Sequence, residues 1–378
     1  MQHADYLAHD ATALAARVAA GDVTPHELLD LALAQHARVH GRVNAVVRLM
    51  EREARDQAAG PLRGPLAGVP FLIKDGVQDY AGIPTTYGSR ALTRNVPAAH
   101  AHVVRRYLEA GLVVFGKTNL PEFATRAVTD PELFGRTNNP WDLGRTPGGS
   151  SGGAAAAVAA GIVPMAAGND GGGSLRIPAA CCGLFALRPS RGRVSSGPGI
   201  GEVWFGASSE GVISRSVRDS ALALDVLHGA EPGDPFVIAP PAAPYVELMR
   251  RDPGRLRIGY ATASPIAHGT GDPSQAEQRL LGFLHGTGIL GVLARLGLLD
   301  RTVDRIATDN LRYVPFTQLS NLTGTPSMSV PLHWTADGLP LGVQFTGPFG
   351  SEDRLLQLAR QLEDVQPWFG RMAEMAHA

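Results

Sequence analysis

The chain has 378 residues, of which 44% are hydrophobic and 18% are charged, and its 34 basic and 35 acidic residues give a formal net charge of −1. This composition is typical of a globular protein with one large or two smaller domains, and it excludes intrinsic disorder and collagen-like repeats. A nearly neutral chain has no overall field that would attract nucleic acid or an anionic membrane, so we expect neither partner.

The ends and the cysteines of the chain point to a cytoplasmic protein. The first 20 residues lack the apolar stretch of a signal peptide, and no apolar run is long enough to span a bilayer. The two cysteines, Cys181 and Cys182, are adjacent, which is a poor spacing for a disulfide. No His, Cys or Asp cluster has metal-ligand spacing, so we expect no metal ion and no other cofactor.

The predicted elements begin with a helix, which the capping box Thr24-Pro25-His26-Glu27 introduces. The elements that follow are a strand over Val46–Met50, a polar helix to Ala59, a strand over Val69–Lys74, a helix over Ala98–Ala110, a strand over Leu112–Lys117, an Ala-rich helix after Ala154, a strand over Val163–Ala167, a strand turning into a helix between Val212 and Val226, strands at Leu256–Tyr260, Met328–Val330 and Leu341–Phe345, and a helix over Arg354–Leu362. The strand–helix–strand unit between Val69 and Lys117 predicts a parallel pair and therefore an α/β fold.

Lysine is rare in this chain. Lys74 and Lys117 are its only lysines, and the other 32 basic residues are arginine. Each lysine ends a predicted buried strand, and functional sites gather at the carboxyl ends of parallel strands. A buried lysine can lose its proton, whereas arginine effectively cannot. Each lysine is therefore a candidate proton acceptor or, alternatively, a buried structural cation.

Two glycine-rich loops carry serines. The first, Gly148–Gly153, fits the Gly-x-Ser-x-Gly nucleophile-elbow pattern, but turn-forming residues precede it where an elbow needs a strand. Neither loop has the Gly-Lys-Ser/Thr of a phosphate-binding loop. In the second, Gly168–Ser174, three glycines precede Ser174; they favour either an oxyanion hole beside a serine nucleophile or a tight turn that caps a helix. Since neither loop holds a histidine, a neutral lysine is the candidate base for a serine.

These loops closely resemble the amidase signature family. The resemblance is carried by Gly148–Gly153, Gly168–Ala179 and Cys182-Gly183, it extends to Gly116–Asn119 and Ser214–Asp219, and it covers most of the chain. It implies one amidase domain over residues 1–378, an α/β/α sandwich around a mixed, largely parallel sheet. Its parts would be N-terminal helices (1–60), a signature core (61–230), a substrate-lining segment that is shorter than usual in the family (261–320), and closing strands and a helix (321–378).

The resemblance also implies the site. Ser174 matches the nucleophile, Ser150 the bridging serine that the family holds on a cis peptide bond, and Lys74 the base. The remaining matches are the oxyanion-hole amides of Gly171, Gly172, Gly173 and Ser174, the supporting polar residues Ser151 and Asp170, the loop-bracing Arg176, the structural Lys117, and the substrate contacts Thr125 and Gly149.

The expected function is that of a serine amidohydrolase that cleaves a C–N bond through an acyl-enzyme. Gly168-Asn169-Asp170 and Asn139-Pro140-Trp141 resemble a subgroup that hydrolyses nylon oligomers such as the cyclic dimer of 6-aminohexanoate, and urethane-cleaving amidases are similar. A carbamate or ester hydrolase with the same triad, the amidase subunit of a glutamine-dependent amidotransferase, and a non-catalytic binding protein remain alternatives. The expected partner is a small amide or carbamate, with a homodimer as a candidate assembly.

Overall fold

The computed structural model describes residues 1–263 and 314–377. The chain divides into two compact units, Met1–Leu256 with Gln318–Ala378, and Arg257–Thr317. The second unit nearly coincides with the substrate-lining segment expected at 261–320, and it lies almost wholly outside the described residues. The fold and the site described below belong to the first unit.

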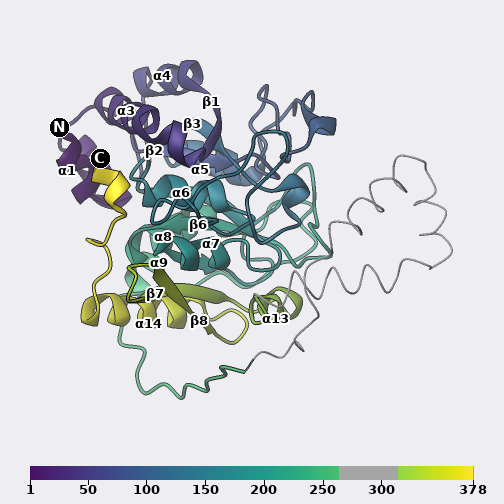
Figure 1. The fold of residues 1–378 in the computed structure, drawn as a ribbon. Helices are drawn as coiled ribbons and strands as arrows, with labels where there is room; N and C mark the ends of the chain where they lie inside the picture. Colours follow the sequence, from purple (N-terminus) through teal and green to yellow (C-terminus); the bar gives the residue numbers. More distant parts are fainter. Residues whose placement is uncertain (264–313, 378) are drawn as a thin grey trace, which may run out of the picture. The chain divides into compact units, whose positions relative to one another are not determined.

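Helices and strands alternate along the first unit (Figure 1). The described elements are α1 (His3–Ala8), α2 (Ala11–Ala19), α3 (Pro25–Val43), β1 (Val46–Leu49), α4 (Glu51–Ala59), β2 (Pro70–Lys74), α5 (His102–Glu109), β3 (Val113–Thr118), α6 (Gly152–Ala159), β4 (Met165–Asp170), α7 (Arg176–Cys182), β5 (Phe185–Arg188), β6 (Ser209–Ser214), α8 (Val217–Leu227), α9 (Tyr245–Leu248), α13 (Thr317–Thr323), β7 (Ser327–Trp334), β8 (Pro340–Thr346) and α14 (Glu352–Val365), with short 3₁₀ helices at Arg90–Leu92, Glu122–Ala124 and Glu374–His377.

The described strands form two sheets. One has the order β1-β3-β2, in which β2 and β3 are parallel, and the other has the order β4-β6-β5-β7-β8. β2 lies next to β4, so the carboxyl ends of these two strands come together. Helices α3 and α4 cover the first sheet, α7 and α8 cover the second, and α6 contacts both. The arrangement is an α/β fold with a mixed sheet, as the sequence predicts.

Two predictions need correction. The sheet is less parallel than expected, because every strand pair from β4 to β8 is antiparallel and the parallel pair is β2 with β3. The strand predicted at Leu256–Tyr260 is wrong. These residues pair with no strand in the described parts of the chain, and Ile258 and Tyr260 are 61% and 91% exposed. An apolar run forms a strand only where a neighbouring backbone takes up its hydrogen bonds.

The strands and α6 form the centre of the core. Every residue of α6 is buried, and β2 through β6 are buried along their whole length. The two ends of the first unit lie close together (Figure 1), where Gln35 of α3 donates a hydrogen bond to the Ala376 carbonyl at 3.2 Å. Within the described ranges, no helix combines the length and the apolar character that a membrane span requires.

The close approach of α6 to the end of β3 explains its small residues. A Cβ added to Gly153 would lie 2.4 Å from the Asn119 backbone nitrogen and 2.7 Å from the Ala45 carbonyl oxygen. Neither backbone atom can swing aside as a side chain would. A Cβ on Gly41, within α3, would meet nothing within 4 Å.

The same substitution should therefore have opposite effects at these two helical glycines. We expect Gly153→Ala to destabilise the fold by about 1–3 kcal/mol through overpacking, and Gly41→Ala to stabilise it by about 0.5–1 kcal/mol through its higher helix propensity. Urea unfolding of both variants measures the two changes. An unchanged midpoint for Gly153→Ala would contradict the packing described for α6.

Candidate active site

The ends of β2 and β4 bring four polar side chains together beneath the start of α6. Lys74 is the last residue of β2, Asn169 and Asp170 are the last residues of β4, and Ser151 directly precedes α6. Because β2 and β4 are adjacent and α6 contacts both, these separate segments converge on one point. Lys74 thus lies at the carboxyl end of a strand in the parallel β2–β3 pair, which is where the sites of open parallel sheets are found.

The amino group of Lys74 is fully buried and has three partners. Its Nζ lies 2.8 Å from Ser150 Oγ, 3.0 Å from Ser151 Oγ and 2.7 Å from Asn169 Oδ1. The Gly149–Ser150 peptide bond is cis, the configuration that the resemblance implies. Burial lowers the pKa of Lys74 to about 7, although the negative charges of Glu210 and Asp170 act to raise it. The neutral amine is therefore accessible near neutral pH.

The chemistry of the donor and acceptor groups fixes the direction of two of these contacts. Asn169 Oδ1 and Ser151 Oγ both accept from Lys74, because an amide oxygen has no proton to give and the Ser151 hydroxyl donates to the Asn169 carbonyl at 3.2 Å. A neutral amine has two N–H donors and one lone pair. With both donors engaged, the lone pair faces the third partner, the hydroxyl of Ser150.

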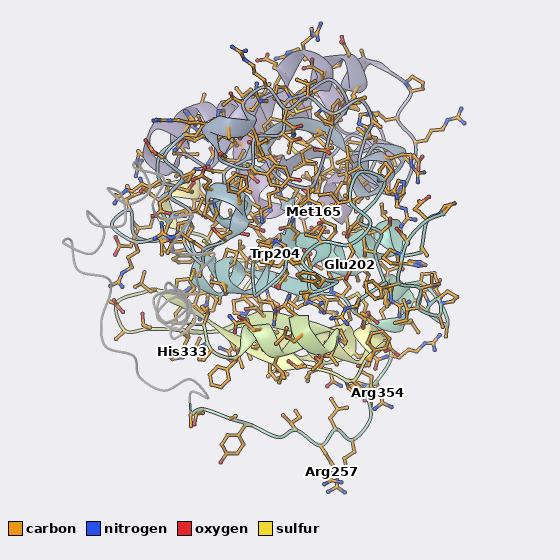
Figure 2. All side chains as sticks on the ribbon, turned by 90° about the vertical axis from the view of Figure 1, so that its right-hand side faces the viewer. Met165, Glu202, Trp204, Arg257, His333 and Arg354 are labelled. Carbon is orange, nitrogen blue, oxygen red and sulfur yellow. The ribbon has the colours of Figure 1, made fainter. Side chains whose placement is uncertain are left out.

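Ser174 and Ser150 line one cavity of about 310 Å³. Ser174 is 8% exposed, whereas Ser150 and Ser151 are 1% and 0% exposed, so Ser174 is the serine that an incoming molecule can reach most readily. The other lining residues are Val77, Tyr87, Phe123, Ala124, Asn169, Gly171, Ile200, Glu202, Val203, Trp204 and Ser208. Trp204 packs against Gly171, where an added Cβ would lie 2.7 Å from the indole. Glu202 and Trp204 lie near the centre of the view in Figure 2.

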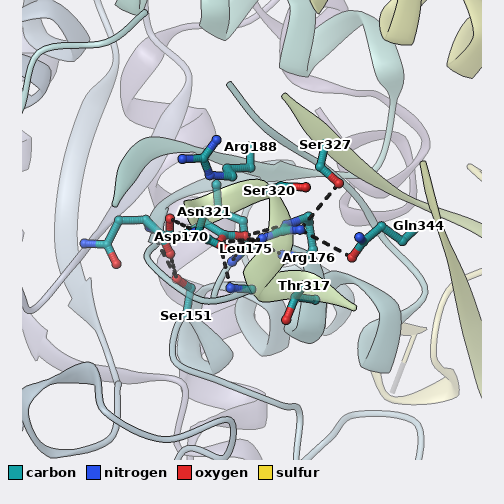
Figure 3. A network of polar contacts seen from close by, with 12 residues as sticks. Ser151, Asp170, Leu175, Arg176, Arg188, Thr317, Ser320, Asn321, Ser327 and Gln344 are labelled. Carbon is teal, nitrogen blue, oxygen red and sulfur yellow. Dashed lines mark hydrogen bonds and ion pairs between the residues drawn. The ribbon is translucent and has the colours of Figure 1, made fainter. Parts of the chain in front are cut away.

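An ion pair braces the loop that carries Ser174. Arg176 donates from Nε and Nη2 to the two carboxylate oxygens of Asp170, both at 2.9 Å, and its Nη2 also donates to Asn321 Oδ1 at 2.7 Å. Figure 3 shows this network, in which Arg176 also reaches Ser327 and Gln344. Burial alone would raise the pKa of Asp170, but the charge of Arg176 outweighs it and holds the pKa well below its usual range. Asp170 is therefore a permanent anion.

The same carboxylate removes one expected oxyanion donor. Gly173 donates its N–H to Asp170 Oδ1 at 2.7 Å, so this amide is already engaged and we correct its assignment. The N–H groups of Gly171 and Ser174 have no hydrogen-bond partner within the described ranges. A Cβ on Gly172 would meet nothing within 4 Å, so the loop is open at that point.

The structure places three other expected residues away from the cavity. Lys117 is buried beside Asp75, with its Nζ 3.7 Å from the carboxylate, and it donates to Thr85 Oγ1 at 2.6 Å. Thr125 is exposed and donates its hydroxyl to the Glu122 carbonyl at 3.0 Å. Gly149 packs on backbone atoms of the segment from Arg126 to Val128. Neither Thr125 nor Gly149 lines the cavity; Phe123 and Ala124 do so instead.

Sequence reasoning missed the partners of Lys74. Asn169 was part of a recognised motif but had no assigned role, although its position at the end of a strand beside Asp170 was a usable signal. Gln78 and Glu210 were not singled out. Glu210 is the charged residue of β6, a strand that is buried throughout, and a charge at such a position is itself unusual. In the part of the chain that the structure describes, no group of three or more His, Cys, Asp or Glu side chains could hold a metal ion.

The comparisons with known proteins identify the family of the chain. The family model described as Amidase matches residues 27–307 and 293–356. The 6-aminohexanoate-cyclic-dimer hydrolase of Pseudomonas sp. (strain NK87) is 32% identical, covering 98% of this chain and 97% of that protein. The acylamidase of Rhodococcus erythropolis is 40% identical, covering 68% of this chain and 55% of that protein.

A solved structure of 6-aminohexanoate cyclic dimer hydrolase complexed with substrate has a TM-score of 0.83 and 31% identity, and it covers 98% of this chain and 99% of that one. The alignment with the Pseudomonas hydrolase runs over 487 positions, more than the 378 residues of this chain, so that relative carries residues that this chain lacks. The family match spans most of the chain, and the chain belongs to the amidase signature family, as a hydrolase that acts on the carbon–nitrogen bond of amides.

Proposed function

We propose that the protein is a serine amidohydrolase in which Ser174 is the nucleophile, Ser150 relays the proton and Lys74 is the base. The observation that carries this proposal is the contact of 2.8 Å between Ser150 Oγ and a fully buried lysine amine whose other two partners both accept hydrogen bonds. A general base works best when its pKa lies near the working pH, because a large share of it is then unprotonated and it still accepts a proton readily. Ser150 lies between this base and the cavity that Ser174 lines.

The proposed reaction has two halves. Ser174 Oγ forms a bond to the amide carbon while its proton passes to Ser150 and the proton of Ser150 passes to Lys74. The tetrahedral oxyanion then collapses, the C–N bond breaks, and the leaving amine takes a proton back through Ser150. Water next attacks the acyl carbon of the ester on Ser174, gives its proton to the same relay, and releases the acid as Ser174 regains its proton.

The loop before Ser174 would hold the oxyanion. Among the described residues, the backbone N–H groups of Gly171 and Ser174 have no hydrogen-bond partner, and the open position at Gly172 gives a carbonyl oxygen room to approach. Preorganised amides stabilise the charge that develops in the transition state. The bidentate ion pair between Asp170 and Arg176 would keep these amides in place.

The cavity favours a compact amide with an apolar chain. Aromatic side chains form much of its wall, through Tyr87, Phe123 and Trp204. The hydrolase relatives act, by name, on a cyclic dimer of 6-aminohexanoate, an amide with aliphatic chains. We infer amides of this aliphatic class as substrates. Turnover of an anilide and its matched carbamate measures whether urethanes are also cleaved.

We expect phenylmethanesulfonyl fluoride to label Ser174, because this serine is the accessible one and lies beside the relay. Peptide mass spectrometry identifies the labelled residue. Ser174→Ala should lose the label and lower amide turnover by at least about 10³-fold, while Ser151→Ala should keep the label on Ser174 but form it more slowly, because Lys74 loses one of its acceptors. A label on Ser150 or Ser151 in the unsubstituted protein would contradict the assignment.

The rate of this labelling should rise with pH, with a midpoint near the pKa of about 7 that burial gives Lys74. The sign follows from the neutral amine being the active form, whose fraction grows as pH increases. Lys74→Arg keeps the charge but cannot accept a proton, so it should slow labelling by about 10²–10⁴-fold, nearly as much as Lys74→Ala does. Rates of labelling, measured at fixed times between pH 5 and 9, give both the midpoint and the effect of each substitution. If Lys74→Arg keeps the rate and the pH profile, the base lies elsewhere.

A further inference from the structure

Glu210 is a buried carboxyl group beside the site that the relay above does not use. It is fully buried on β6, directly opposite Asn169 in the antiparallel register of β4 and β6. Residues directly opposite each other in such a pair project from the same face of the sheet. Asn169 holds the amino group of Lys74, so the carboxyl of Glu210 lies on the face that carries the base.

Gln78 connects Glu210 to the other end of Lys74. The backbone N–H of Lys74 donates to Gln78 Oε1 at 2.7 Å, which identifies the opposite end of the amide as its NH₂ group. Gln78 Nε2 then donates to Glu210 Oε2 at 2.7 Å and to the Gly168 carbonyl at 3.1 Å. The carboxyl is thus fixed relative to the strand end that positions the base.

The second oxygen of this carboxyl is unusual. Glu210 Oε1 is buried and accepts no hydrogen bond of good geometry within the described residues, although the Asn169 amide on the paired strand interacts with the carboxyl. An ionised carboxylate with one unsolvated oxygen is costly in a protein interior. Burial raises the pKa of Glu210 to about 7, although the hydrogen bond from Gln78, the charge of Lys74 and the Asn169 amide each favour the ionised form. Glu210 therefore titrates in the same pH range as Lys74.

We propose that Glu210 is a positioning residue that sets the protonation state of Lys74: its ionised form holds Lys74 as an ammonium ion, and its protonated form releases the neutral amine. This inference rests on the proposed role of Lys74 as the base. Burial alone disfavours the ammonium form of Lys74 and lowers its pKa, which makes it a weaker base. A nearby anion stabilises the ammonium form and raises the pKa again. Glu210 supplies that anion, and two groups coupled in this way titrate as a pair.

The other titratable groups around this pair stay fixed near neutral pH. The charge of Glu210 acts on Tyr87 and Tyr107, but burial raises the pKa of Tyr87 to about 12 and that of Tyr107 well above its usual value, so both remain neutral. Asp170 acts on Lys74 but remains ionised through its pair with Arg176. Among the described groups that act on this pair, the charges that change near pH 7 are therefore those of Glu210 and Lys74 themselves.

The test follows the pH dependence of Ser174 labelling by phenylmethanesulfonyl fluoride, which needs no knowledge of the substrate. Glu210→Gln removes the charge and keeps an oxygen for Gln78, so the midpoint of the rate profile should fall by about one pH unit. Glu210→Asp, which keeps the charge, should leave the midpoint closer to that of the unsubstituted protein. A structural role alone would lower the rate at every pH and leave the midpoint in place.

Glu363 of α14 offers a matched control. Burial raises its pKa to about 7 as well, but it accepts its hydrogen bond from the Val217 backbone at 3.1 Å, outside the site. Glu363→Gln should leave the midpoint unchanged. If Glu210→Gln does not fold, Gln78→Met gives the same test, because losing its hydrogen bond favours the protonated carboxyl and should also lower the midpoint.

The outcomes separate the two proposals. If the labelling rate does not rise with pH, or if Lys74→Arg shows the same rise, the proposed function fails. Suppose instead that Lys74→Arg abolishes the rise of the labelling rate with pH, but neither Glu210→Gln nor Gln78→Met shifts the midpoint of that rise. Glu210 then does not set the protonation of Lys74, and this inference alone is overturned. A lowered midpoint in Glu210→Gln with an unchanged one in Glu363→Gln supports it.

Discussion

The amino group of Lys74 has no access to water, and the rest of the site follows from that constraint. A buried ammonium ion is destabilised unless its surroundings replace its hydration, so the neutral form becomes accessible near pH 7. Asn169 and Ser151 accept its hydrogen bonds and leave Ser150 as the third partner. A surface lysine with the same neighbours would remain protonated in all but about one molecule in a few thousand at neutral pH.

Two carboxyl groups near this amine have different physical roles. Asp170 accepts hydrogen bonds from Arg176 and from backbone amides, so it is a constant charge that shapes the nucleophile loop. Arg176 in turn donates to Ser327 of β7 and Gln344 of β8. Glu210 lacks a complete set of partners and titrates with the amine. Both carboxyls are fully buried, so the difference arises from the charge and hydrogen bonds of Arg176, which Asp170 has and Glu210 lacks. The site therefore contains one carboxylate whose charge is constant, Asp170, and one carboxyl whose charge changes near pH 7, Glu210.

The sequence predicted the parts of this site that depend on local pattern. The scarcity of lysine and the strand end at Lys74 pointed to a titratable base, and the glycine loops pointed to Ser150 and Ser174. Local pattern could mark Asn169 and Glu210 as unusual, but their pairing depends on the antiparallel register of β4 with β6, which joins residues 41 positions apart and cannot be read locally. The parallel share of the sheet and the strand at Leu256–Tyr260 were misjudged for the same reason, because strand pairing is a property of distant segments.

The protonation of Lys74 can be observed directly, because the chain has only two lysines. Labelling with ¹⁵Nζ-lysine should give two side-chain nitrogen signals, and the one absent from Lys74→Arg belongs to the base. The account predicts that this signal changes from ammonium to amine with a midpoint near pH 7, while Lys117, whose pKa burial lowers to about 8 against the opposing charge of Asp75, titrates later. A Lys74 signal that remains that of an ammonium ion up to pH 9 would contradict the central claim that this lysine is a neutral base.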